Sequence, residues 1–535
     1  MRKILASLAL ILVFGCSALA AAYNAKPKLA VVIIVDQLRG DLMERHYSDF
    51  GPGGFRLFMD RGAWFSNAYY QYANTRTCPG HATLGTGTYT LGHGILANDW
   101  WDPQAKKVVS CTEDPAEQPV GAASRDRGDS PRRLLTTTIG DELKLATSGR
   151  ARVYGVALKA RSAIMPVGYS ADGAFWIEHD TGAFLSSTYY MKEAPAWLTA
   201  FNAAKPAAKY EGLEWKDRAG KVMRSTGPQQ ENGKPLDYYE RIGRTPYAND
   251  YTLEFTRALI ENEKLGTGPA TDLLTVSFSS HDILQHKVGP DSEQEREMIV
   301  ALDRQLAGFF QYLVKRYGEG NFLLALSADH GTAPLPSFAS TLRIPAANLK
   351  RPDVVNELNA AISKKLGREA KYVVRYDYPN AQLDTAAFEG TNLTQAEAER
   401  TVGEAMVQLG MRNYFTKSQL ASGDVPNTVF TRQFLNAYSP HSGWYVIGYS
   451  APFIVGWGAG TDHALPYSYD THVPVAFYGP QFRPGQYRTA AEPVDLAVTL
   501  SSVLGISKPA SAVGRVLTEA IADQPRVPVA TGGRR

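Results

Sequence analysis

A run of seven apolar residues that ends in an acidic one, LAVVIIVD at residues 29–36, constrains the fold more than any other stretch. Such a run is typical of a strand buried on both faces of a parallel sheet. Similar runs recur at residues 151–159, 271–282, 321–331 and 473–479. Stretches with helical periodicity lie between them, at residues 131–147, 250–265 and 293–318. Strands that alternate with helices predict an α/β fold with a doubly wound, mostly parallel central sheet flanked by helices.

Two long segments fit this alternation less well. Residues 195–250 are rich in Lys, Pro, Gly and Tyr, and residues 335–450 contain helix and strand patterns of their own. We expect both segments to be insertions that form a cap over the sheet and its active site. Residues 519–535 have the composition of a disordered tail, so the main domain is expected to span residues 23–518.

The first 22 residues have the pattern of a cleaved signal peptide. Arg2 and Lys3 precede an apolar stretch from Ile4 to Phe14, and small residues follow. This stretch is too short to span a membrane as a helix, so a periplasmic or secreted protein without a membrane span is expected. Cys16 follows a sequence that approximates a lipoprotein processing site, which leaves lipid anchoring as the alternative, although the bulky Phe14 disfavours it.

The charge balance excludes some classes of partner. The chain has 56 Lys and Arg against 53 Asp and Glu, and it contains no long basic run. A nucleic-acid scaffold is therefore not expected. The length of 535 residues and the 44% hydrophobic content allow a large buried core.

Four groups of Asp and His residues adjoin the ends of predicted strands. They are Asp36, the pair Asp282 and His286, the pair Asp329 and His330, and His472. Each has an ordinary explanation as a turn, a helix cap or a surface pair. However, the carboxyl ends of parallel strands meet at one edge of a sheet, where ligands bind. Carboxylate oxygens and imidazole nitrogens together predict a metal site there, while spacing alone leaves the metal and the reaction open.

The stretch NTRTCPGHATLGTG, residues 74–87, supports two interpretations of Thr77. Pro79 suits the first turn of a helix, and a Thr two residues earlier is placed to cap it. The same end of a helix carries a partial positive charge and free N–H groups, so it also stabilises an alkoxide or a phosphate. On this stretch alone Thr77 is either a helix cap or a nucleophile.

Several motifs resemble, in the same order, those of the alkaline phosphatase superfamily, and within it those of the PafA-like bacterial alkaline phosphatases. The resemblance extends from about residue 29 to 515. It is carried by Asp36, TCPGH (77–81), NDWWD (98–102), LKARSAIMPVG (158–168), SSHDILQHKVGPDS (279–292), SADHG (327–331) and YDTHVPVAFYG (469–479). It implies an exported alkaline phosphatase that hydrolyses phosphate monoesters and has two Zn²⁺ per chain.

The resemblance also implies roles for individual residues. One zinc would be held by Asp282, His286 and His472. The other would be held by Asp36, Asp329, His330 and the nucleophile oxygen of Thr77. Thr77 would form a phosphothreonine that water on the first zinc then hydrolyses. Asn98, Lys159 and Arg161 would contact the phosphoryl oxygens. His81 and His463 lie in or near matched motifs without an implied metal contact.

Two local features extend this hypothesis. Lys159 and Arg161 are two residues apart, so on an extended segment their side chains would face the same side and meet one phosphate. Cys78, directly after Thr77, departs from the family pattern. If Cys16 is removed with the signal peptide, only Cys78 and Cys111 remain, and we predict a disulfide between them.

Three alternatives remain open. A phosphodiesterase or nucleotide pyrophosphatase of the same superfamily would share the metal ligands but would have less use for two cations at the phosphate. A sulfatase would need Cys/Ser-x-Pro-x-Arg at the nucleophile, whereas Pro79 follows Cys78 directly. A non-catalytic exported protein would have a closed structural metal site. The favoured interpretation is a monomeric enzyme that acts on small-molecule phosphate esters.

Overall fold

The computed structural model describes residues 27–124, 127–349, 353–456 and 460–522. The expected signal peptide with Cys16, and residues 523–535 of the expected tail, lie outside these ranges. Residues 519–522, also expected in the tail, instead belong to the folded body: Ala520 is buried at the end of η4 (Thr518–Ala520), and Ile521 forms a β-bridge with Phe482. No helix in the described ranges is both long and apolar enough to cross a membrane.

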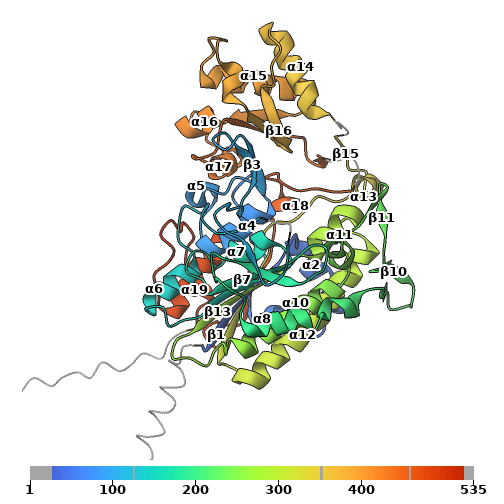
Figure 1. Ribbon diagram of the computed structural model, residues 1–535, viewed down its shortest axis with the longest axis vertical. Helices are drawn as coiled ribbons and strands as arrows, with labels where there is room; N and C mark the ends of the chain where they lie inside the picture. Colours follow the sequence, from blue (N-terminus) through green and yellow to red (C-terminus); the bar gives the residue numbers. More distant parts are fainter. Residues whose placement is uncertain (1–26, 125–126, 350–352, 457–459, 523–535) are drawn as a thin grey trace, which may run out of the picture.

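A ten-stranded sheet forms the centre of the molecule (Figure 1). In spatial order its strands are β22 (Gly485–Tyr487), β2 (Ala63–Phe65), β21 (Val475–Tyr478), β14 (Phe322–Ser327), β1 (Leu29–Val35), β13 (Asp272–Phe278), β6 (Val153–Val156), β7 (Gly173–Ile177), β8 (Phe184–Ser187) and β5 (Pro119–Val120). The strands from β14 to β7 are parallel. On either side of them, β21 and β8 are antiparallel to their neighbours. The predicted α/β fold is confirmed, with a mixed sheet whose parallel part lies at its centre.

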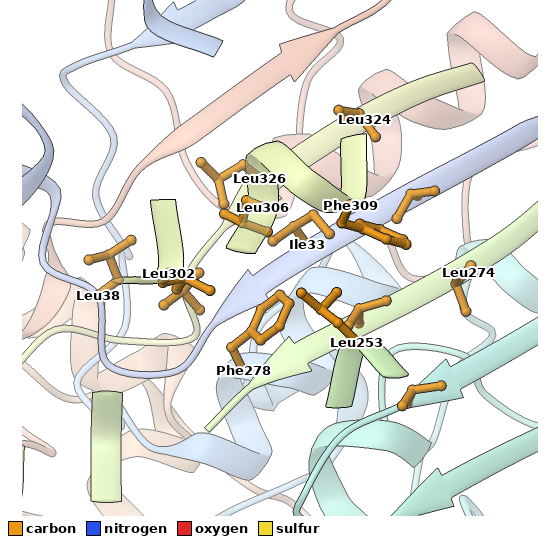
Figure 2. Packing of buried hydrophobic residues seen from close by; sticks show 14 of the residues in the cluster. Ile33, Leu38, Leu253, Leu274, Phe278, Leu302, Leu306, Phe309, Leu324 and Leu326 are labelled. Atoms are coloured by element: carbon orange, nitrogen blue, oxygen red, sulfur yellow. The ribbon is translucent and has the colours of Figure 1, made fainter. Parts of the chain in front are cut away.

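The side chains of β1 alternate between two hydrophobic cores, because successive residues of a strand point to opposite faces. Ile33 points to the face covered by α10 (Tyr247–Asn262) and α12 (Glu293–Tyr317), where it lies near Leu306 and Phe309 (Figure 2). Ile34 points to the opposite face. That face is covered by α6 (Ile139–Ala146), α7 (Ala160–Ile164) and α19 (Val494–Leu504). Both faces of β1 are therefore buried, as its continuous apolar sequence predicts.

The helix predicted over residues 131–147 is confined to α6. The hydroxyl of Thr138 accepts a hydrogen bond from the N–H of Asp141, and the Asp141 carboxylate accepts one from the N–H of Thr138. This capping box satisfies free N–H groups and begins the helix at Ile139. The residues from 131 to 137 form a turn and bends instead.

Helices begin close to the carboxyl edge of the parallel strands. β13 leads into α11 (Ser280–Val288), and α4 (Thr77–Thr86) packs against the end of β14. A Cβ on Gly80 of α4 would lie 2.3 Å from the carbonyl oxygen of Asp329. Glycine is therefore required for this close approach, which brings the start of α4 to the strand end.

Residues 353–449 form a separate layer at one end of the molecule (Figure 1). Its four-stranded antiparallel sheet consists of β16 (Val373–Asp377), β17 (Asn380–Leu383), β19 (Tyr445–Tyr449) and β18 (Asn413–Thr416). The helices α14 (Val354–Leu366) and α15 (Gln395–Gln408) pack on this sheet around their own core. Arg76, just before α4, connects this layer to the main body through an ion pair of 3.1 Å with Asp377.

Residues 195–250 do not form a second such layer. Leu198 of α8 (Ala196–Ala203) and Tyr210 of η2 (Pro206–Tyr210) join the core beneath α10. Trp215 of β9 (Glu214–Lys216) packs against Leu284 of α11 and against α12. The following elements are β10 (Val222–Ser225), β11 (Gln230–Glu231), β12 (Lys234–Pro235) and α9 (Tyr238–Gly243). The expected cap is thus reduced to α9, whose Tyr239 lines the cavity beside Lys159.

Candidate metal centre and phosphate site

The structure brings five of the six predicted Asp and His ligands together at the carboxyl edge of the sheet. Asp36 directly follows β1, and Asp329 and His330 follow β14. Asp282 and His286 lie one turn apart on α11. Two groups have ligand atoms within 4.8 Å of one another: Asp282, His286 and His463, and Asp36, Asp282 and His330.

Three histidines of this cluster have the same orientation. In each ring Nδ1 faces a backbone carbonyl oxygen, which requires Nδ1 to carry the proton and to donate it. The distances are 2.9 Å from His286 to Thr461, 3.0 Å from His330 to Gly331 and 2.6 Å from His463 to Thr75. Hydrogen bonds of this kind fix the tautomer and leave Nε2 as the ligand atom.

The free Nε2 atoms face carboxylates. His286 Nε2 lies 3.1 Å and His463 Nε2 lies 3.9 Å from Oδ1 of Asp282. His330 Nε2 lies 3.7 Å from Oδ1 of Asp36 and 3.5 Å from Oδ2 of Asp329. Imidazole nitrogens and carboxylate oxygens therefore converge, as the donor set of a zinc site does.

His472 does not join this cluster, which corrects its predicted assignment to a zinc. It lies at the same edge of the sheet, because β21 runs antiparallel to β14, but its ring stacks on Tyr69 with ring centres 4.6 Å apart. Its Nε2 lies 3.1 Å from the carbonyl oxygen of Ser66. The ring also fills the space beside Gly40, where a Cβ would lie 2.7 Å from Nε2. The nitrogen that a metal would need is thus directed elsewhere.

His463 takes the place predicted for His472. It lies in a loop rather than next to a strand, and its ring stacks on that of His330 with centres 3.8 Å apart. The sequence contained one signal that could have found it: Asp462 and His463 form an Asp-His pair, as Asp329 and His330 do.

The cluster contains more negative than positive charge. Asp36, Asp282 and Asp329 are buried, and in the described ranges Lys159 is the one Lys or Arg side chain bonded to any of them. Burial and the neighbouring carboxylates raise the pKa of Asp36 well above its usual range. Four buried atoms have no hydrogen-bond partner among the described residues: Asp36 Oδ1, Asp282 Oδ1, Asp329 Oδ2 and His330 Nε2. Because unpaired buried charges are costly, this cluster fits bound cations.

Thr77 is the first residue of α4 and is 2% exposed. The N-cap position belongs to Arg76, and no side chain caps the helix, so the capping interpretation of Thr77 is wrong. Thr75, two residues earlier, carries the other hydroxyl near the helix start, and it is occupied: it accepts a hydrogen bond from the N–H of Ala464 and donates one to the carbonyl of Leu465. Thr77 is therefore the hydroxyl at the helix start that remains available.

His81 holds the start of α4 against the cluster without entering it. Its Nδ1 lies 2.8 Å from the carbonyl oxygen of Thr77 and 3.1 Å from Oδ2 of Asp329. Its Nε2 lies 2.8 Å from the hydroxyl of Ser277 on β13. Both ring nitrogens are thus engaged, which agrees with the absence of a predicted metal contact.

Lys159 is the N-cap residue of α7 and Arg161 lies in its first turn, so the expected extended segment is wrong. Both nevertheless line one cavity of about 410 Å³. Lys159 Nζ donates to Oδ2 of Asp36 at 2.6 Å and to Oδ2 of Asp282 at 2.5 Å. Burial alone would lower the pKa of Lys159, but these carboxylates hold it above its usual range. Arg161 has no ion pair in the described ranges, and its Nε is buried without a hydrogen-bond partner there.

Asn98 lies between α4 and the hairpin of β3 (Asp99–Asp102) and β4 (Lys107–Ser110). The backbone N–H of Cys78 donates to its side-chain oxygen at 2.8 Å, which leaves the amide NH₂ free to donate. The predicted disulfide between Cys78 and Cys111 is confirmed.

Its similarity to known proteins shows that the chain belongs to the alkaline phosphatase superfamily. Within it, residues 30–392 match the family described as type I phosphodiesterase / nucleotide pyrophosphatase, and the chain is a member of that family.

Two bacterial relatives are similar over nearly the whole chain. Alkaline phosphatase PafA of Elizabethkingia meningoseptica is 33% identical, over 93% of this chain and 95% of the relative. Alkaline phosphatase PhoV of Synechococcus elongatus is also 33% identical, over 92% and 93%. The crystal structure of wild-type PafA matches with a TM-score of 0.85 and 32% identity, over 93% of this chain and 99% of that one. These findings confirm the predicted superfamily and fold, and the chain is a phosphatase of this superfamily.

Proposed function

We propose that this protein is a phosphomonoesterase that works through a phosphothreonine at Thr77 and uses two zinc ions. One observation carries the proposal: the guanidinium of Arg161, which has no ion pair among the described residues, lines the same cavity as Lys159, whose ammonium group is bonded to the buried cluster. An unpaired, half-buried cation next to a cation-binding cluster suits a doubly charged phosphate monoester.

The residues present fit two metal ions. Asp282, His286 and His463 would hold one, and Asp36, Asp329 and His330 would hold the other, with Thr77 alongside. Three imidazoles and three carboxylates favour zinc over manganese or magnesium. When bound, the ions would supply Lewis-acid charge for the oxygens of the nucleophile, the leaving group and the phosphoryl group.

The protein's own residues would position and stabilise the reacting groups. Thr77 Oγ1 attacks the phosphorus in line with the leaving oxygen, and its P–O bond forms as the ester bond breaks. The N-terminal N–H groups of α4 favour negative charge at this position. Arg161 and the free NH₂ of Asn98 donate hydrogen bonds to the non-bridging oxygens, over which the transition state spreads its charge. Water then hydrolyses the phosphothreonine, which releases phosphate and restores the Thr77 hydroxyl.

Export is part of the proposal. The signal-peptide pattern of residues 1–22 supports a periplasmic or secreted enzyme, and the Cys78–Cys111 disulfide suits an oxidising compartment. We expect the enzyme to act as a monomer on small phosphate esters.

The rival function is that of a phosphodiesterase, which the family description includes. A diester replaces one charged oxygen with an organic group and gains less from Lys159 and Arg161. The decisive experiment measures kcat/KM on an aryl phosphate and on the matching methyl aryl phosphate, with the metal content determined on the same sample. A much higher value for the monoester and two zincs per chain support the proposal. A higher value for the diester would assign the rival function.

A further inference from the structure

Gln37, the residue after Asp36, has an unusual backbone conformation for its type. Its φ is +67°, and its side chain is fully buried. A Cβ disfavours this left-handed region, whereas glycine adopts it without steric cost. Backbone geometry alone therefore favours glycine at this position, and the retained side chain calls for a separate reason.

The backbone of Gln37 is bonded to one part of the metal cluster. Its N–H donates to Oδ1 of Asp329 at 3.0 Å, and the N–H of His330 donates to the same oxygen at 3.0 Å. Oδ1 of Asp329 is thus occupied, and Oδ2 is the oxygen left without a hydrogen-bond partner among the described residues. The Gln37 N–H therefore helps to select the oxygen that faces the cation site.

The side chain of Gln37 reaches the other part of the cluster. Its Nε2 donates to Oε1 of Gln285 at 3.2 Å, and both side chains are fully buried. Gln285 lies on α11 between Asp282 and His286 and directly precedes His286. Gln37 thus joins the ends of β1 and β14 to the helix that carries the remaining ligands. With both amides fully buried, bulk water cannot replace this bond without rearrangement of the structure.

We propose that Gln37 is a positioning residue that sets the spacing between the two ligand groups, Asp36 and Asp329 on one side and Asp282 and His286 on the other. The inference rests on the metal site of the proposed function. It assigns the side chain a role that the turn itself does not need, because the turn would form at least as well with glycine.

The test is a zinc titration of the metal-free protein in competition with a chelator of known affinity. Gln37→Gly keeps the N–H to Asp329 and relieves the left-handed backbone, while it removes the buried side chain together with its bond to Gln285. Loss of a hydrogen bond behind metal ligands typically weakens metal affinity about 10- to 100-fold, and we expect such a loss for at least one of the two ions. Gln285→Leu should produce a similar loss, and the double variant should lose little more than either single one.

Lys264→Gly is the matched control. Lys264 is also left-handed, with φ of +53°, but it is exposed and remote in sequence from the cluster, so zinc affinity should stay unchanged. Full zinc affinity at both sites in Gln37→Gly would overturn the inference and leave the proposed function standing. A wild-type protein that binds no zinc would overturn both. Thermal unfolding of the metal-free variants separates weaker binding from misfolding: Gln37→Gly should still unfold in one cooperative transition, at a temperature lowered by the loss of the buried side chain.

Discussion

The backbone N–H of Cys78 donates a 2.8 Å hydrogen bond to the side-chain oxygen of Asn98. Cys78 is also disulfide-bonded to Cys111, whose own N–H donates to the carbonyl oxygen of Asn98 at 2.9 Å. The disulfide therefore connects the start of α4, where Thr77 lies, to the segment that presents the Asn98 amide. In the proposed function the disulfide would therefore help to position the phosphate site, beyond its role as a covalent link.

Replacement of both cysteines with alanine should lower the rate with phosphate monoesters, because the disulfide helps to hold Asn98 in position. If the amide loses its position, about one neutral hydrogen bond to the phosphate is lost, which corresponds to roughly a fivefold drop in kcat/KM for a monoester. The bridge spans 33 residues, so its loss should also lower the free energy of unfolding by about 3–4 kcal/mol. Rates and urea unfolding curves of the double variant check both effects.

Asn98→Ala is the control for this prediction. Adding it to the double cysteine variant should reduce kcat/KM little further, because the same interaction is already lost. Free thiols in the unfolded, unreduced wild-type protein would contradict the disulfide itself.

His463 and His472 should differ sharply when each is replaced with alanine. His463→Ala removes an imidazole whose Nε2 faces Asp282, so the zinc content should fall from two toward one per chain, with loss of nearly all activity. His472→Ala should keep both zincs and lose about 1–3 kcal/mol of stability through the cavity beside Tyr69. Elemental analysis and thermal unfolding distinguish the two, and the opposite pattern would restore the original assignment of His472.

Arg161→Ala should affect phosphate monoesters more than diesters. A charge-assisted hydrogen bond contributes about 1.5–3 kcal/mol, so kcat/KM for an aryl phosphate should fall roughly 10- to 100-fold. The fall for a methyl aryl phosphate should be clearly smaller, because a diester carries one negative charge fewer. Steady-state rates on the two matched substrates provide the measurement.

Arg127 offers a matched control from the same cavity. Its guanidinium is already ion-paired with Glu113, so Arg127→Ala should change neither rate more than a few-fold. If Arg161→Ala lowers kcat/KM equally for both substrates, the guanidinium does not distinguish the doubly charged monoester from the singly charged diester.

The ligands next to strands could be predicted because their position follows from the fold. Asp36 directly follows a long apolar run and Asp329 lies two residues after another, β14, and such runs identify buried parallel strands whose ends meet. The spacing of Asp282 and His286 places them on one face of a helix whatever its exact start. These predictions depend on strand ends and helical periodicity, which short stretches of sequence specify.

His463 could not be found in this way, because a long connection brings it to the cluster. It precedes β21 by more than ten residues, and its position depends on hydrogen bonds of this loop with Thr75. His472 lies next to a predicted strand and was therefore selected by the same criterion of a position near a strand end. The direction of its ring, however, depends on packing against Tyr69. Sequence spacing predicted the edge at which a residue lies, but not the direction of its ring.

Acid should destabilise the protein in part through His93, which lies outside the metal cluster. The ring is fully buried, and burial lowers the pKa of His93 to about 3. Below about pH 6.5 the unfolded chain binds a proton that the folded chain does not, so stability falls as the pH drops from about 6.5 to 3. One such group contributes a slope of up to about 1.4 kcal/mol per pH unit in this window.

His93→Asn isolates this contribution. In metal-free protein, the loss of unfolding free energy between pH 7 and pH 5 should be smaller in the variant than in the wild type. Urea denaturation at the two pH values measures it. Identical losses in the two proteins would show that His93 does not titrate in this way.

Thr77 is proposed to carry the phosphoryl group during turnover, and rapid acid quenching of the enzyme with an aryl phosphate would trap this intermediate. Mass spectrometry of the digested protein should find one added phosphoryl group on the peptide that contains Thr77. Thr77→Ala should abolish this product and nearly all turnover while it keeps the six Asp and His ligands, and Thr75→Ala should still form it. No phosphoenzyme under single-turnover conditions, a label on another residue, or substantial turnover by Thr77→Ala would show that Thr77 is not the nucleophile.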